Sequence, residues 1–206
     1  GKCMFLEDDI VTAPGFLQFI NDGLEFYKDD KNIISVGGHT PNLKANLDNE
    51  KDVYFARRFH PWGVGFWKDE YHKIKPISKA ELNDKKTIKK INEYGTDLHG
   101  MMLEDAAGNI NALDVRACFL MAKEDLYTVV PTVTLVKNIG LDGSGFHCGN
   151  LDIHEGDIIS SKTKLNLVGF YYQDRLRQEY KIFYDRPVAI VRIFNKILRI
   201  LLKRFK

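Results

Sequence analysis

The feature that most constrains the fold is a short apolar segment, residues 2–6, that runs directly into three consecutive acids, Glu7, Asp8 and Asp9. An apolar run of this length with such a boundary is typical of a buried strand. Ligands of open α/β sheets bind outside the carboxyl ends of the strands. We therefore predict a buried strand at residues 2–6 that presents three carboxylates in a loop at the rim of a sheet.

Strand and helix patterns alternate after the acids. Thr12 as N-cap, Pro14 in the first turn and apolar residues at helical spacing predict an amphipathic helix. Further strands are predicted at residues 32–36, 53–56 and 127–130, with 131–138 extended, and further helices at 78–94, 97–107 and 113–123. The order of these elements predicts an α/β fold, a mixed sheet flanked by helices.

Composition and charge exclude some classes of function. The 206 residues are 44% hydrophobic and 12% aromatic, enough for a sizeable core in one domain or a little more. Residues 186–206 hold seven Lys or Arg and no acid, so the tail carries +7 and the rest of the chain −5. A body of negative charge does not suit a nucleic-acid binder. Three widely spaced cysteines and no apolar run of about 18 residues predict a reducing, cytoplasmic setting.

The chain divides into a unit at residues 1–170 and a basic amphipathic helical tail at 171–206. Basic and apolar residues recur in the tail at helical spacing on different faces: Arg192, Lys196, Arg199, Lys203 and Lys206, against Ile193, Ile197, Ile200 and Leu201. Such helices lie in the interface of anionic membranes, which predicts a protein peripheral on the inner face of the membrane. The alternative is a helix that docks its apolar face on the domain or on a protein partner.

The acidic triplet suggests a metal site. Three adjacent carboxylates repel one another, and this costs stability unless a cation or several backbone amides offset it. Their hard oxygens suit Mg²⁺ or Mn²⁺, and few protein ligands would leave positions open for a substrate diphosphate. The alternative is a solvated acidic turn that caps the following helix.

Three blocks of sequence resemble a known family in the same order. Leu6-Glu7-Asp8-Asp9 followed by Pro14-Gly15-Phe16-Leu17 resembles the metal-binding strand and helix of GT-A glycosyltransferases of the N-acetylglucosaminyltransferase I type and their relatives in cell-surface polysaccharide synthesis. The other blocks are Trp62-Gly63-Val64-Gly65-Phe66-Trp67-Lys68 and Leu113-Asp114-Val115-Arg116, which continues to residues 136–140 and 143–147. The resemblance implies a GT-A-like (Rossmann-like) catalytic unit whose upstream, N-terminal nucleotide-binding half is missing.

The resemblance also implies the site. It suggests a nucleotide-sugar donor held through a divalent metal, Mn²⁺ or Mg²⁺, with Asp9 as metal ligand and with Glu7 and Asp8 near the ribose and the transferred sugar. Asp114 matches the position of the general base, although the family usually has an aromatic residue where this chain has Leu113. An acid in the first turn of a helix is also favoured by the macrodipole alone, which is the alternative for Asp114.

The remaining candidates lie in the glycine-rich segments. His147 lies in the loop at residues 140–149, whose glycines suit a closing lid, and it could complete the metal shell or simply be exposed. Gly63 and Gly145 are candidate donor-binding residues with Trp62, whose ring could also stack on a sugar near the acceptor cleft, while Trp67 is expected to be buried. Arg57 and Arg58 could reach phosphate or lie at a solvated strand end.

The sequence thus predicts a metal-dependent, inverting glycosyltransferase that moves a hexose or N-acetylhexosamine to a hydroxyl of a saccharide or lipid-linked acceptor. One alternative is a metal-dependent hydrolase of phosphoesters or glycosides that activates water with the same carboxylates. Another is a non-catalytic, membrane-associated sugar-binding module in which the triplet is only a capped turn.

Overall fold

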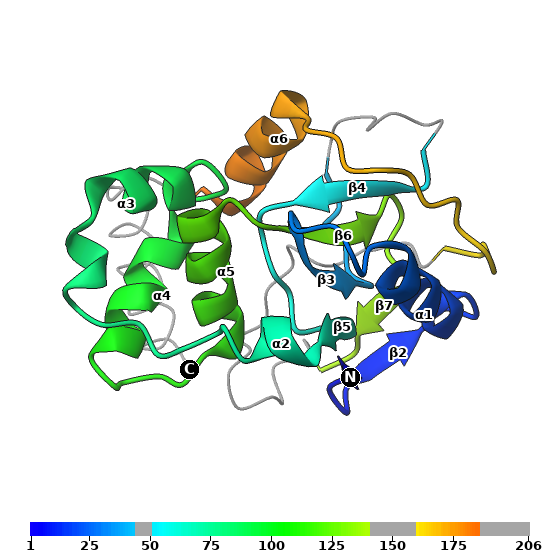
Figure 1. The fold of residues 1–206 in the computed structure, drawn as a ribbon, viewed down its shortest axis with the longest axis horizontal. Helices are drawn as coiled ribbons and strands as arrows, with labels where there is room; N and C mark the ends of the chain where they lie inside the picture. Colours follow the sequence, from blue (N-terminus) through cyan, green and yellow to red (C-terminus); the bar gives the residue numbers. More distant parts are fainter. Residues whose placement is uncertain (44–50, 141–159, 186–206) are drawn as a thin grey trace, which may run out of the picture.

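The computed structural model describes residues 1–43, 51–140 and 160–185. These residues form an α/β structure with a five-stranded mixed sheet, a two-stranded sheet and flanking helices. Figure 1 shows α3, α4 and α5 gathered on one side of the sheet and α1 on the other. The predicted α/β class, with a mixed sheet between helices, is confirmed at this level.

The main sheet has the order β1-β5-β3-β6-β4. Only β3 and β6 run parallel, and the other pairs are antiparallel. Two further strands, β2 and β7, form an antiparallel ribbon. The strands are β1 (Lys2–Phe5), β2 (Ile10–Thr12), β3 (Ile33–Gly37), β4 (Val53–Ala56), β5 (Val64–Trp67), β6 (Tyr127–Pro131) and β7 (Val136–Asn138).

Six α-helices and one 3₁₀ helix accompany these strands in the described part of the chain. They are α1 (Phe16–Phe26), α2 (Lys68–Tyr71), η1 (Glu81–Asn83), α3 (Lys85–Asn92), α4 (Asp97–Ala106), α5 (Leu113–Glu124) and α6 (Asp174–Tyr184). None of the described helices is long and apolar enough to cross a membrane.

Strand alternation sends side chains to two separate cores. Val53, Phe55 and Val129 pack with α1 and with residues 165–171, whereas Tyr54 and Val130 pack with α6. Because side chains of a strand alternate between the faces of a sheet, one short strand serves both cores. The third core lies between the sheet and helices α3, α4 and α5.

Glycines allow α1 to lie close to the sheet. A Cβ at Gly65 would meet Ile20 and Leu24 of α1 at 2.6 and 2.8 Å. A Cβ at Gly63, whose φ is +68°, would meet the Phe16 ring at 2.8 Å. The glycines of the Trp62–Trp67 block therefore have a packing role in this fold.

The segment before α6 is tied to the start of β4 by Asp52. This buried carboxylate accepts hydrogen bonds from the Asn166 backbone at 2.9 Å and the Asn166 amide at 3.1 Å, and it pairs with Lys162. Farther along, Tyr180 of α6 is fully buried, and its hydroxyl lies 3.3 Å from that of Tyr54. The helix α6 is therefore packed on the same body as the sheet.

Several predicted details are wrong. The strand at residues 2–6 forms, but it is exposed, with Met4, Phe5 and Leu6 each more than 40% accessible. The reason is its place at the edge of the sheet, because α1 packs chiefly on β3 and β5. Thr12 lies in β2, where it pairs with Val136 of β7, and it does not cap α1.

The predicted helix at 78–94 is also wrong in its extent. It is divided into η1 and α3 because the Asp84 carboxylate accepts hydrogen bonds from the backbone amides of Lys86 and Thr87, which starts a new helix. Trp67 is only half-buried, with its indole donating to the Leu24 carbonyl at 3.1 Å. The predicted tail contains α6, and its residues 186–206 lie outside the described residues.

Candidate functional site

The acidic triplet lies in the turn between β1 and β2. The Ile10 amide donates to the Glu7 carbonyl at 3.3 Å, and the Ile139 amide, at the end of β7, donates to the Asp9 carbonyl at 2.9 Å. Pairing of β2 with β7 thus brings the residues after β7 against the turn. Glu7 and Asp9 are half-buried, and Asp8 is exposed.

The Asp9 carboxylate lies close to Gly140 through one oxygen, and its other oxygen lacks a hydrogen-bond partner among the described residues. A Cβ at position 140 would overlap Oδ2 of Asp9, so only glycine fits there without moving the carboxylate. Oδ1 is buried and has no hydrogen-bond partner among the described residues. A buried carboxylate oxygen without a donor is costly, and this makes it a candidate cation ligand.

Asp114 occupies the first turn of α5 and is half-buried. Burial raises the pKa of its carboxyl, while hydrogen bonds from the Val115 amide and its own amide, together with the charge of Arg58, oppose the rise. The backbone hydrogen bonds fit the helix-terminal role that the sequence left open. A raised pKa is also what a proton acceptor would need, and the assignment of Asp114 as the general base stays a prediction.

Electrostatics joins Asp114 to the acidic turn. The pKa of Glu7 is raised first by burial and then by the negative charges of Asp9, Asp114 and Asp8. The charge of Asp114 therefore acts on a carboxyl of the acidic turn, although the two lie more than 100 positions apart in the sequence. We call Glu7, Asp9 and Asp114 the carboxylate cluster.

An ion pair fixes the start of α5, which carries Asp114. The side chain of Asp105, at the end of α4, is fully buried and accepts from Arg116 Nε at 2.8 and 3.1 Å. Asp105 also accepts from the backbone amide of Ala112, the N-cap of α5, at 3.2 Å. These bonds hold the first turn of α5 against α4 and thereby set the position of Asp114.

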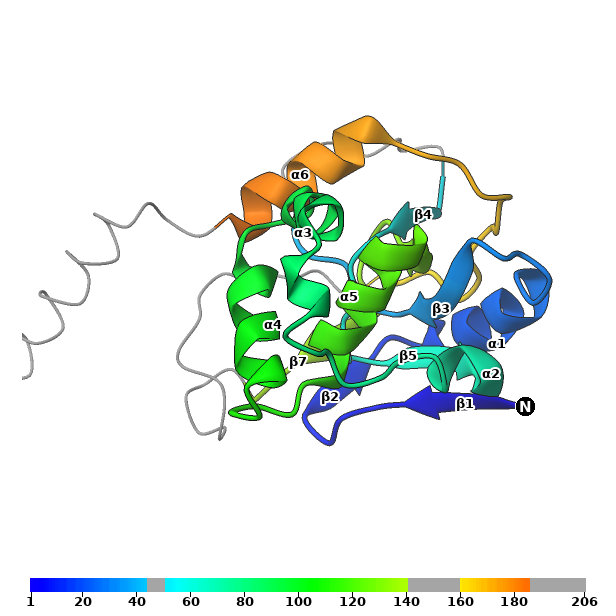
Figure 2. The ribbon, with the colours of Figure 1, turned by 60° about the vertical axis from the view of Figure 1, so that its left-hand side comes forward.

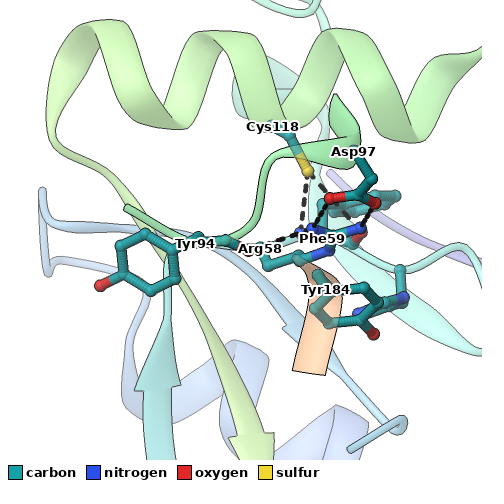
Figure 3. Close-up of polar contacts among 7 residues, drawn as sticks. Arg58, Phe59, Tyr94, Asp97, Cys118 and Tyr184 are labelled. Carbon is teal, nitrogen blue, oxygen red and sulfur yellow. Dashed lines mark hydrogen bonds and ion pairs between the residues drawn. The ribbon is translucent and has the colours of Figure 1, made fainter. Parts of the chain in front are cut away.

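A second ion pair joins Arg58 to Asp97. Arg58, just after β4, donates to both carboxylate oxygens of Asp97 and to the Tyr94 carbonyl at 3.1 Å. Figure 3 shows its guanidinium between Asp97 and the ring of Tyr184, whose centroid is 3.4 Å away. Burial alone would lower the pKa of Arg58, but Asp97 reverses this and raises it, so the cation is permanent.

Cys118 completes this region from α5. Its sulfur accepts from the Phe59 amide at 3.2 Å, and burial raises the pKa of the thiol to about 12. A thiol of this kind is not reactive at neutral pH. Cys118 therefore packs against the segment after β4 and has no chemical role in the site.

Aromatic rings gather near Trp62. The Trp62 ring lies 4.6 Å from the His39 ring between centroids, and the His60 ring lies 4.7 Å from that of His39. The Tyr184 hydroxyl contacts His60 Nε2 at 3.0 Å. The half-buried Trp62 therefore packs against a group of rings, and its role as a sugar platform stays a prediction.

The structure corrects the expectations for the two arginines and leaves others open. Arg57 and Arg58 do not lie at a solvated strand end, because both are buried, and Arg57 pairs with Asp125 at 2.8 Å. Gly63 packs under α1, and its donor-binding role stays a prediction. Gly145 and His147 lie outside the described residues. Across the described ranges, no group of three or more His, Cys, Asp or Glu side chains is arranged to hold a metal.

Sequence reasoning missed the positioning roles of Arg58 and Asp105. The only signal for Arg58 was its position in an Arg pair at a strand end, between an apolar run and an aromatic block. Asp105 had no signal, because its partner Arg116 lies on another helix.

No protein-family model matches the chain, and no curated protein matches it.

The raised pKa of Glu7 predicts a pH-dependent gain in stability from Glu7→Gln. In the wild type the folded protein holds the proton more tightly than the unfolded chain, so stability falls as pH rises from the unfolded value of 4.5 through the folded value. Urea denaturation should show the variant to be more stable than wild type at pH 7, with the gain shrinking toward pH 4. Asp8→Asn is the matched control and should gain less, because Asp8 is exposed. A gain of equal size at both pH values would contradict the raised pKa of Glu7.

Removal of the Arg58 charge should affect both the stability of the fold and the pKa of Asp114. Arg58→Met leaves Asp97 without its partner and should destabilise the fold by about 3–5 kcal/mol, the usual cost of breaking a buried pair. It should also raise the pKa of Asp114 further, since Arg58 lowers it. Chemical denaturation and carboxyl NMR titration measure the two effects. Lys123→Met, which breaks the exposed pair with Glu81, should cost no more than about 1 kcal/mol.

Proposed function

We propose that the chain catalyses metal-dependent transfer of a sugar from a nucleotide-sugar donor to an acceptor hydroxyl, within a GT-A-like unit. The observation that supports this most directly is the carboxylate cluster, in which the charge of Asp114 at the start of α5 acts on Glu7 of the acidic turn. The three sequence blocks that resemble the N-acetylglucosaminyltransferase I type supply the reaction class. The cluster would supply two groups that this reaction needs, a cation ligand and a base.

One oxygen of the cluster supports the proposal of a divalent cation. Asp9 would be the protein ligand, because its buried Oδ1 has no other partner among the described residues and is a hard oxygen donor. His147 remains the proposed second ligand. A bound Mn²⁺ or Mg²⁺ would stabilise the charge that develops on the departing diphosphate. Gly140 leaves room for the Asp9 carboxylate, since a Cβ there would overlap Oδ2.

Asp114 is proposed as the general base. The acceptor oxygen would attack the anomeric carbon while its proton passes to an Asp114 carboxylate oxygen. The carbon–oxygen bond to the diphosphate breaks, and the nucleoside diphosphate leaves with the electron pair, which inverts the configuration. A raised pKa makes Asp114 a stronger base than an exposed aspartate, and the charge of Arg58 opposes this rise in pKa.

Other residues would orient substrates and exclude water. Glu7 and Asp8 are proposed to contact the ribose and the transferred sugar, with Gly63 and Gly145 in the donor site. The Trp62 ring, supported by His39 and His60, is proposed to stack on a sugar face. Water exclusion favours transfer over hydrolysis of the donor.

The proposed acceptor is a saccharide or a lipid-linked saccharide at the inner face of the membrane. This rests on the basic amphipathic pattern of residues 186–206, with seven basic residues and no acid. The protein would be peripheral there, bound to anionic lipid and not to nucleic acid.

The test compares three variants with wild type in a donor-turnover screen with Mn²⁺ and then with chelator. Asp9→Ala should abolish metal-dependent turnover, because it removes the proposed ligand. Asp114→Asn should keep donor binding but lower transfer at least about 100-fold, the usual scale for loss of a general base. Asp69→Asn, an exposed acid on α2, is the control and should behave as wild type.

The other outcomes separate the alternative functions. Wild-type transfer by Asp114→Asn would reduce Asp114 to a helix-terminal acid. Release of free sugar with no transfer to any acceptor would indicate a hydrolase. Sugar binding without metal dependence or turnover would indicate a binding module.

A further inference from the structure

A basic pocket lies away from the residues assigned to the reaction. It has a volume of about 690 Å³ and opens between α3, α4 and α6. Figure 2 shows α6 lying beside α3. Basic side chains line it from three elements: Lys85 and Lys89 from α3, His99 from α4, and Arg177 and Lys181 from α6. Glu93 is the single acid in the lining, so the formal charge of the lining residues is +3 with His99 neutral.

The two helices each present a like-charged pair at the same spacing. Lys85 and Lys89 are four positions apart on α3, and Arg177 and Lys181 are four positions apart on α6. Residues at this spacing lie on one helix face, where like charges repel. Where such a pair lacks acidic partners, it leaves a positive potential that an anion would relieve.

The pairs differ in how they are compensated. On α6, Arg177 is bonded to Asp174 at 2.7 Å and Lys181 to Asp185 at 2.6 Å. Lys85 and Lys89 have no ion pair or side-chain hydrogen bond within the part of the chain that the structure describes. The α3 lysines are therefore the pocket cations with charge available for a ligand.

We propose that this pocket binds the phosphate of an anionic lipid headgroup. Lysine ammonium groups suit phosphate as point charges, and the Arg177 guanidinium can add a directed hydrogen bond. A membrane source is favoured because α6 leads within two residues into a segment, residues 186–206, that carries seven basic residues and no acid. The pocket and the tail would then act on one anionic surface. The inference rests on the proposed membrane association and not on the proposed sugar transfer.

The experiment is co-sedimentation of the full chain with vesicles of phosphatidylcholine alone and of phosphatidylcholine with phosphatidylglycerol. Lys85→Gln/Lys89→Gln should lower the partition coefficient on the anionic vesicles about 10- to 30-fold, the effect of two surface lysines. Gln keeps the helix propensity of Lys, so α3 should be retained, and circular dichroism checks this. Lys31→Gln/Lys68→Gln makes the same charge change at exposed lysines near α1 and β5 and should alter partition less than about twofold.

Each other outcome overturns the proposal in a distinct way. Equal partition of the pocket double variant and the control would leave membrane association to the tail alone. Failure of wild type to bind anionic vesicles would remove the membrane proposal as well. Soluble glycerol phosphate that saturates the Lys85 and Lys89 amide shifts, with no vesicle binding through these lysines, would identify a free phosphate as the ligand. Donor turnover is measured separately, so its loss or survival bears only on the proposed reaction.

Discussion

The buried ion pair of Arg58 with Asp97 is the interaction on which the rest of the structure depends. A guanidinium with 6% exposure would not be stable in an apolar core without partners on every side. Its partners come from α4 through Asp97, from the Tyr94 carbonyl before α4, and from the Tyr184 ring at the end of α6. The pair therefore joins the segment after β4 to two helices, and the same cation lowers the pKa of Asp114 on a third.

The carboxylate cluster, unlike the Arg58 ion pair, brings charges of the same sign to bear on one another. Glu7, Asp9 and Asp114 lie where burial and mutual repulsion raise the pKa of Glu7, and Asp9 Oδ1 has no donor among the described residues. An arrangement of this kind costs stability in the isolated chain. Strained or uncompensated groups are concentrated at functional sites, because the ligand offsets their cost when it binds. The proposed divalent cation would offset this cost at the carboxylate cluster. The charge of Arg58 opposes the rise in the pKa of Asp114.

The sequence predicted most elements because their patterns are local. The strands at 32–36 and 53–56 and the helices at 97–107 and 113–123 form within one or two residues of the prediction. The exposure of β1 was not predictable from its sequence. It depends on the position of the strand at the edge of the sheet, where it pairs with β5 alone among the described strands. Asp9 and Asp114 could be named as candidate site residues from their motifs. The positioning roles of Arg58 and Asp105 could not be predicted, because the partner of each residue lies on another element.

The most direct test of the account follows the carboxyl pKa values of Glu7 and Asp114 by ¹³C NMR while Mg²⁺ is added to the full chain. A cation held at Asp9 should lower the pKa of Glu7, because it offsets the negative charges that raise that pKa without metal. The Asp114 pKa should fall in the same titration, and neither should change in Asp9→Asn. Identical titration curves for Glu7 with and without metal, or equal shifts in Asp9→Asn, would contradict a metal site at the carboxylate cluster.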